Sequence, residues 1–457
     1  MPVNEGMVPE YPQGSSVPKL DAEIELFVQH IDALQSSLPG VKIVITTAEQ
    51  EAYERFKRYA DKYGEIAEQT DNSTKFAFRQ PYNARAARLS KAIKEVKAAN
   101  EIIPRVFVLA LVSQFDAFLG RLLRVLFLLR PELIANSERS LTLSQLLELG
   151  TIESATEYLL EKEIEGVLRK SHVEQFSWME SKFGIKLHEG LSSWPVFVEL
   201  TERRNLFAHS NGVISDQYLA VCNAHNVQLP SDCSRGTVLD VKADYFMQAY
   251  CCVYEIGVKL AQVLWRKLKP EQMGDADDSL ISVTYDLIVS SKYDLACNLL
   301  DFACETLKKH GSEQARLIMI INRAQAYKWA GNAELCKKTL SDEDWSACSP
   351  QFHLAVAVLE DEFDKATDIM RTIGAKGTMQ EIYYQDWPIF RKFRLSSQFA
   401  QAYLEVFGQP FVHVEKLLIT DERERQREML TKLKSMLEEN DHSESKESAT
   451  DRKLTEQ

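Results

Sequence analysis

Three residues suited to phosphate chemistry lie within six positions of one another: Arg204, Asn205 and His209, in the stretch RRNLFAHSNG. On a helix, positions four apart share a face, so Asn205 and His209 point the same way and Arg204 lies on the flank. An imidazole transfers protons near neutral pH, which suits a 2′-hydroxyl or a leaving 5′-oxygen. A guanidinium suits a phosphate whose negative charge grows in the transition state. These residues predict RNA cleavage without a metal ion.

The spacing between Arg and His is uninformative alone, because a chain with nine histidines produces such pairs by chance. Asn directly after Arg204 makes the pattern more specific and favours Arg204 over Arg203. The residues Ser210-Asn211-Gly212 predict that the helix ends after His209. A helix C-terminus carries partial negative charge, which suits a cationic imidazole and the role of general acid. The alternative is that the two arginines are solvated helix-end cations and His209 is a capping residue.

Two helices must position these residues. Ser193 followed by Trp194-Pro195 predicts the start of the helix that carries Arg204, because serine caps and proline is tolerated in the first turn. An earlier apolar helix, roughly 101–130, is stopped by Pro131 and contains Asp116 in SQFDAFL. Its charged interruptions indicate a buried helix and not a membrane span.

The segment RNLFAH near a helix end, preceded by the helix LVSQFDAFLGRLLRVLF, resembles the HEPN superfamily over about residues 100–268. The resemblance implies an all-α domain and metal-independent endoribonuclease activity. The family motif R-[NDH]-x-x-x-H maps onto Arg204, Asn205 and His209, and Asp116 matches the acidic position of the earlier helix. The alternative for Asp116 is that it only pairs with a nearby arginine.

The same resemblance implies a homodimer, because two such domains typically pair so that both motifs face one composite site. It also implies a role in stress or phage defence. A HEPN-like fold that has lost activity and serves only for binding is a further alternative.

A repeat pattern follows in SSKYDLACNLLDFA, AYKWAGNAELCKKTL and AVLEDEFDKATDIM. In each segment an aromatic or small residue stands three positions before a small one: Tyr293 and Ala296, Ala333 and Cys336, Phe363 and Ala366. The small residues are 40 and 30 positions apart, near the period of tetratricopeptide (TPR) repeats, which the segments resemble. The alternative is a set of generic helical hairpins. A TPR-like array predicts a protein or peptide partner.

The composition predicts an all-α protein, a HEPN-like helical bundle followed by a short TPR-like α-solenoid. The expected domains are an N-terminal leader with little regular structure (1–45, with a strand-like run GVKIVITT), a helical HEPN-like domain (46–272), TPR-like repeats (279–407) and a charged, partly disordered tail (421–457). Pro270 to Asp278 is the expected boundary between the two helical domains. Within them, a short helix (DAEIELFVQHIDALQSSL) is expected before the strand-like run. A capping box at Thr47 and Gln50 predicts a new helix that TDNST breaks, and further helices are expected at about 83–99 and in ADYFMQAYCCVYEIGVKLAQVLWRKL, with turns over 213–240.

The net charge and the cysteines restrict which classes of function fit the sequence. The formal net charge of -13 and the lack of a Lys/Arg-rich run argue against extended nucleic-acid binding, although a short basic cleft fits the sequence. No spacing typical of metal ligands is present, so we expect neither metal nor cofactor. Eight cysteines without a C-x-x-C pair, and no signal peptide, predict reduced thiols in a cytoplasmic protein without a membrane partner.

The sequence thus predicts a regulated, metal-independent endoribonuclease, a toxin or defence effector, that acts on an RNA substrate at a dimer interface. The competing prediction is a non-enzymatic interaction protein, in which the repeats hold a partner and the HEPN-like domain only dimerises.

Overall fold

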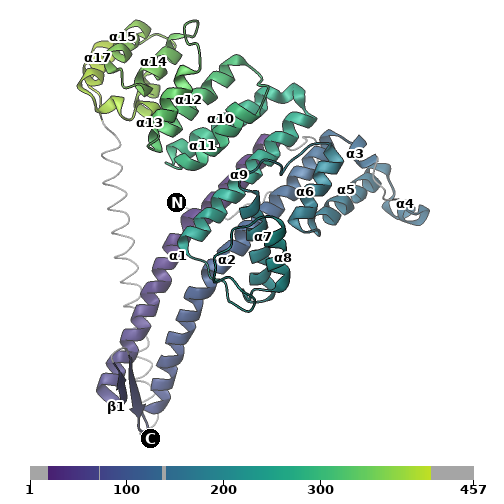
Figure 1. Ribbon diagram of the computed structural model, residues 1–457, viewed down its shortest axis with the longest axis vertical. Coiled ribbons are helices and arrows are strands. Elements are labelled where there is room, and N and C mark those ends of the chain that lie inside the picture. Colours follow the sequence, from purple (N-terminus) through teal and green to yellow (C-terminus); the bar gives the residue numbers. More distant parts are fainter. Residues whose placement is uncertain (1–18, 71–72, 136–139, 413–457) are drawn as a thin grey trace. The chain divides into compact units, whose positions relative to one another are not determined.

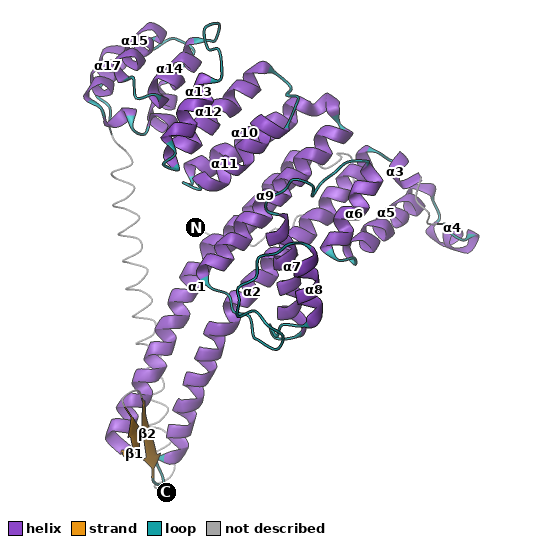
Figure 2. Cartoon of the chain, in the orientation of Figure 1, coloured by secondary structure: helices purple, strands orange, loops and turns teal. Residues whose placement is uncertain are grey.

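Helices make up nearly all of the regular structure (Figures 1 and 2). The all-α class predicted from the composition is therefore confirmed. The computed structural model describes residues 19–70, 73–135 and 140–412, so the tail predicted at 421–457 lies outside the described residues. The chain divides into two compact units, Met1–Leu340 and Ser341–Gln457.

The first unit contains α1 (Leu20–Tyr63), β1 (Gly64–Thr70), β2 (Ser73–Phe78), α2 (Asn83–Leu129), α3 (Glu132–Ala135), α4 (Leu143–Leu149), α5 (Ile152–Leu168), α6 (His172–Phe183), α7 (Trp194–His209), α8 (Asp216–Ala224), α9 (Ala243–Leu268), the 3₁₀ helix η1 (Pro270–Gln272), α10 (Met273–Val289), α11 (Tyr293–Asp301), the π-helical turn η2 (Phe302–Thr306), α12 (Glu313–Trp329) and α13 (Ala333–Ser341). The second contains α14 (Pro350–Leu359), α15 (Phe363–Ile373), α16 (Glu381–Asp386), the 3₁₀ helices η3 (Pro388–Phe390) and η4 (Phe393–Leu395), and α17 (Ser397–Phe407).

Helices α1 and α2 pack against each other along most of their length and are joined by the antiparallel hairpin of β1 and β2 (Figure 2). The hairpin pairs Gly64 with Phe78 at one end and Thr70 with Ser73 at the other. The sequence predicted only a break at this point. The strands were missed because β1 is nearly all exposed and has no apolar alternation.

The helix predicted in DAEIELFVQHIDALQSSL is present, but it is only the start of α1, one helix of 44 residues that runs through Pro39. A leader with little regular structure over 1–45 is therefore wrong from Leu20 onward. The strand predicted in GVKIVITT is also wrong. Thr47, predicted to open a new helix, lies inside α1 and donates from Oγ1 to the carbonyl oxygen of Ile43 at 2.9 Å. Proline costs about 3 kcal/mol in a helix interior and glycine about 1. Packing of α1 against α2 outweighs these local preferences.

The two helices predicted at about 83–99 and 101–130 are a single helix, α2. Asn100, at the predicted interruption, accepts from Nζ of Lys42 at 3.1 Å and donates to Oε2 of Glu49 at 2.9 Å, so it ties α2 to α1. Among the described residues, α2 is the one helix long and apolar enough to cross a membrane. Its C-terminal half packs against α1, α5, α7 and α9, which buries the apolar side chains.

Helices α7 and α9 follow the predicted segments, VFVELTERRNLFAH and the helix from Ala243 to Leu268. Positive φ angles at Asn211 (49°) and Gly212 (82°) end α7 where the sequence predicted. The segment between them, predicted to be turns, also contains α8. Helix α9 is buried along most of its length and contacts α1, α2 and α7, so it forms the centre of the first unit.

The domain boundary predicted at Pro270 to Asp278 does not divide the chain. Helix α10 starts directly after η1 and packs against α9, α11 and α12. A buried ion pair joins Arg266 of α9 to Asp277 of α10, with Nη2 2.7 Å from Oδ1. The chain instead divides into its two compact units after Leu340, and not between the predicted domains 46–272 and 279–407.

The three predicted repeat segments each contain the second helix of a helical hairpin, in the pairs α10/α11, α12/α13 and α14/α15. In each turn the residue two positions before the second helix has a positive φ: Ser291 (57°), Gly331 (86°) and Asp361 (63°). The following N–H donates to a carbonyl five positions back: Lys292 to Leu287, Asn332 to Tyr327 and Glu362 to Ala357. The hairpins thus share one turn geometry, although the third lies in the second unit.

Candidate active site

An ion pair between α2 and α7 brings the predicted site residues Asp116 and Arg204 together. Nη2 of Arg204 lies 2.6 Å from Oδ2 of Asp116, and both side chains are partly exposed, at 23% and 28%. Nη1 of Arg204 donates to Oδ1 of Asn205 at 3.3 Å. Nε of Arg204 is buried and has no hydrogen-bond partner among the described residues. The guanidinium is thus held between an aspartate and an asparagine at the edge of the unit.

The second oxygen of Asp116 is occupied by His172, the first residue of α6. Nε2 of His172 lies 2.8 Å from Oδ1 of Asp116. A carboxylate paired with an arginine only accepts, so Nε2 carries the hydrogen. The ring is 7% exposed and packs against Phe115 and Phe197. His172 therefore positions Asp116 and has little access to a ligand.

Glu202 adds a further carboxyl group next to this network. Burial raises its pKa above the ordinary value, and the positive charges of His172 and Arg204 oppose that shift. Glu202 stands two positions before Arg204 on α7, where it is half-buried. The network therefore combines two carboxyl groups with one arginine and one histidine.

His209 lies apart from this network, at the last residue of α7. It is exposed and makes no hydrogen bond or ion pair with the described part of the chain. The turn after it is fixed by Arg105 of α2, whose Nη1 donates to the backbone oxygen and Oδ1 of Asn211, both at 3.2 Å. Arg105 also lies over the ring of Phe207, 5.6 Å from its centroid. The imidazole is thus free for a ligand while the helix end that carries it is clamped.

Arg203, the neighbour that also fits the looser spacing, is a buried structural residue. Its Nε donates to Oε1 of Glu199 at 2.6 Å, and its Nη1 donates to the backbone oxygen of Asp240 at 3.2 Å. The hydroxyls of Tyr218 and Tyr245 also donate to Glu199, at 2.6 and 2.8 Å. With a 10% exposed side chain, Arg203 offers nothing to a ligand.

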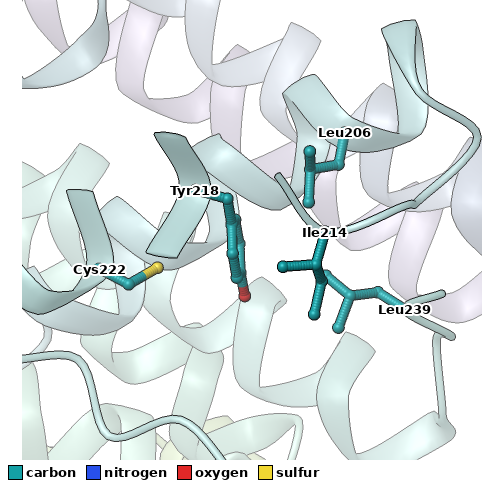
Figure 3. Packing of buried hydrophobic residues seen from close by; sticks show 5 residues of the cluster. All are labelled: Leu206, Ile214, Tyr218, Cys222 and Leu239. Carbon is teal, nitrogen blue, oxygen red and sulfur yellow. The ribbon is translucent and has the colours of Figure 1, made fainter. Parts of the chain in front are cut away.

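A small cluster of buried apolar side chains packs against the C-terminal half of α7 (Figure 3). Leu206, one turn before the exposed His209, is buried against Ile214, Tyr218, Cys222 and Leu239. The ring of Tyr218 stands between Cys222 and the two aliphatic side chains of Ile214 and Leu239. The cluster joins α8 and the turns after α7 to the helix that carries the site.

The structure brings Asp116, Arg204 and Asn205 into contact, and it places His209 about one helical turn beyond Asn205. Sequence reasoning missed His172, Glu202 and Arg105. A Ser171-x-x-Glu174 capping box marks the helix start next to His172, but no spacing relates that start to α2. Within the described ranges no group of three or more His, Cys, Asp or Glu side chains is arranged to hold a metal ion.

Comparisons of this chain with protein-family models, with curated proteins and with solved structures find no match.

Proposed function

We propose that the protein is a metal-independent endoribonuclease of the HEPN type, a regulated toxin or defence effector of the cytoplasm. The observation that carries the proposal is the ion pair of Asp116 with Arg204, which anchors an arginine beside Asn205 on the helix that ends at an exposed His209. An arginine and a histidine near the same helix end are suited to metal-free cleavage of a phosphodiester.

In this mechanism Arg204 binds the scissile phosphate. Its contacts to Asp116 and Asn205 use two of the five donors of the guanidinium. The remaining Nη donors bind phosphate oxygens and stabilise the charge that builds up as the 2′-hydroxyl attacks phosphorus. Asn205 orients the phosphate, and Asp116, held by His172, positions Arg204.

His209 transfers the proton. It donates to the 5′-oxygen as the bond from phosphorus to that oxygen breaks, and the products are a 2′,3′-cyclic phosphate and a 5′-hydroxyl. One exposed imidazole provides either the acid or the base, so a second copy of the chain completes the site: its His209 accepts the proton of the 2′-hydroxyl as that oxygen attacks phosphorus. An exposed apolar face of α2 N-terminal to Asp116 supports such pairing, since it exposes Ile102 (50%) and Val106 (45%).

The experiment expresses wild-type protein, His209→Ala and Arg204→Ala, and compares growth and the integrity of total RNA and tRNA in lysates containing EDTA. We expect growth inhibition and RNA cleavage from wild type alone. His225→Ala is the matched control, a histidine at the C-terminus of α8, and retains activity. Cleavage that survives His209→Ala, or that EDTA abolishes, contradicts the mechanism.

A non-enzymatic interaction protein is the competing proposal. It is supported by the three helical hairpins with one turn geometry, which suit stacking and the binding of a peptide or helix. If neither wild type nor variant cleaves RNA under any activating condition, this proposal is favoured.

A further inference from the structure

The distal part of the α1–α2 hairpin carries a charge opposite to that of the rest of the chain. We define the arm as residues 53–97, the end of α1, the β-hairpin and the start of α2. The arm contains 11 Lys and Arg against 6 Asp and Glu, a net charge of +5. The other 412 residues then carry a net charge of -18. The positive charge was not evident as a run in the sequence, because the lysines and arginines are spread among other residues over 45 positions.

Most of these lysine and arginine side chains are exposed to solvent and form no ion pair. All the arm's lysines and arginines are exposed except the half-buried Arg55. Four of them form ion pairs: Arg55 with Glu51, Lys75 with Glu68, Arg79 with Glu65 and Lys91 with Glu95. Seven others make no ion pair with any described residue: Lys57, Arg58, Lys62, Arg85, Arg88, Lys94 and Lys97.

Aromatic rings are interleaved with these cations. Phe78, Tyr59, Tyr63 and Tyr82 form a continuous series, with successive centroids 5.9, 5.0 and 4.6 Å apart. Lys62 lies over the Tyr63 ring and Arg85 over the Tyr59 ring. At its margin, Tyr82 is 39% exposed, and Tyr53 is 58% exposed on α1. Exposed rings beside cations are the features that bind single-stranded nucleic acid, because bases stack while phosphates are neutralised.

We propose that the arm binds single-stranded RNA and leads it along α2 toward the site at Asp116 and Arg204. Lys97 is 19 residues from Asp116 on the same helix, a distance of about 28 Å. The acidic remainder of the chain disfavours RNA elsewhere, so RNA binds at the arm and the site to which the arm leads. This inference deepens the proposed function and rests on it for the choice of RNA over DNA.

An anionic membrane is the other surface that attracts lysine and arginine. The described residues nearest the turn of the hairpin, which would reach a bilayer first, are polar and exposed: Glu68, Gln69, Thr70, Thr74 and Lys75. On the hairpin only Ile66 is a large, exposed apolar side chain among those described. Insertion requires a continuous apolar face, which the arm does not present.

The test measures binding separately from cleavage, with full-length protein carrying His209→Ala so that the RNA stays intact. A fluorescein-labelled, mixed-sequence RNA of about 20 nucleotides, longer than typical single-strand sites, is titrated by fluorescence anisotropy. The arm variant adds Lys57→Glu with Lys94→Glu. The matched control adds Lys337→Glu with Lys376→Glu, two exposed lysines outside the arm.

We expect the arm variant to raise Kd at least tenfold while the control stays within twofold of its parent. The dependence of log K on log salt concentration becomes shallower by about 0.7 for each phosphate that the variant no longer neutralises. Tyr53→Ala with Tyr82→Ala weakens binding about fivefold or more, because bases no longer stack on these rings. Equal RNA affinity of arm variant and control contradicts the proposal. So does binding of the parent to phosphatidylserine vesicles but not to RNA. If wild-type protein does not cleave RNA although the His209→Ala protein binds it through the arm, only the proposed catalysis is contradicted.

Discussion

Asp116 of α2 and Arg204 of α7 are 88 positions apart in the chain, and their side chains meet at 2.6 Å. The aspartate is held on its other oxygen by His172, so α2, α6 and α7 converge on one carboxylate. A guanidinium held in this way is oriented before any ligand binds, which is the condition under which an arginine accelerates phosphate chemistry.

Replacing Asp116 tests this orienting role. Asp116→Asn keeps the size of the side chain but removes the charge that holds Arg204. We expect kcat for RNA cleavage to fall about a hundredfold, with KM changed much less, because misorientation affects the transition state more than binding. Single-turnover cleavage assays measure both values. An unchanged kcat contradicts a positioning role for Asp116, and circular dichroism checks that the variant folds.

Arg203 and Arg204 are adjacent but have opposite roles. Arg203→Met leaves Glu199 buried without its cation, so we expect the free energy of unfolding to fall by about 3 kcal/mol. Arg204→Met removes a partly exposed ion pair and lowers it by about 1 kcal/mol or less, while abolishing cleavage. Urea unfolding followed by circular dichroism gives both values. The reverse order of the two stabilities is incompatible with these roles.

The exposed face of α2 is the proposed dimer contact. Ile102 and Val106 are one turn apart, and Ser113 and Ala117 continue the same exposed face toward Asp116. Val106→Asp places a charge on this face, so we expect a shift from dimer to monomer in sedimentation velocity and a parallel loss of cleavage. Leu395→Asp, a 69% exposed leucine in the second unit, is the control and leaves the dimer intact. If the wild-type protein sediments as a monomer at the concentrations of the cleavage assay, a composite site between two copies is contradicted.

The buried Asp277 gives the first unit a pH-dependent stability. Burial alone raises the pKa of a carboxyl group, but hydrogen bonds from His310, the N–H of Gly311 and Arg266 outweigh it, and the pKa of Asp277 lies below its ordinary value of 3.8. A depressed carboxyl pKa adds stability at pH values above 3.8 and loses it as the pH falls toward the folded-state pKa. We expect Asp277→Asn to cost about 2 kcal/mol near pH 7 and progressively less below about pH 4. A cost that is constant down to about pH 2.5 contradicts this.

The parts of the fold that the sequence predicted well have strong local signals. Helix α7 has serine and proline at its start and Asn211-Gly212 at its end, and α9 has one long apolar face. Tertiary packing decided the rest. The β-branched run near Thr47 remains helical because α1 lies along α2, and Pro270 to Asp278 is no boundary because Arg266 reaches across it to Asp277.

The candidate site was only partly visible in the sequence for the same reason. Asn205 and His209 are related by helical spacing, and Asp116 entered only through the family resemblance. His172 and Arg105 meet the site through helix packing, which no spacing encodes. The basic arm was missed for another reason: its lysines and arginines are spaced among other residues, so a search for a contiguous basic run does not find it.

The chemistry of the RNA ends tests the central claim most directly. Purified wild-type protein is incubated with RNA in EDTA, and the ends of the fragments are analysed. Transfer of a proton from His209 to the leaving oxygen predicts 5′-hydroxyl and 2′,3′-cyclic phosphate ends, and their absence with His209→Ala. Fragments with 5′-phosphate ends, or the same ends produced by His209→Ala, contradict the account.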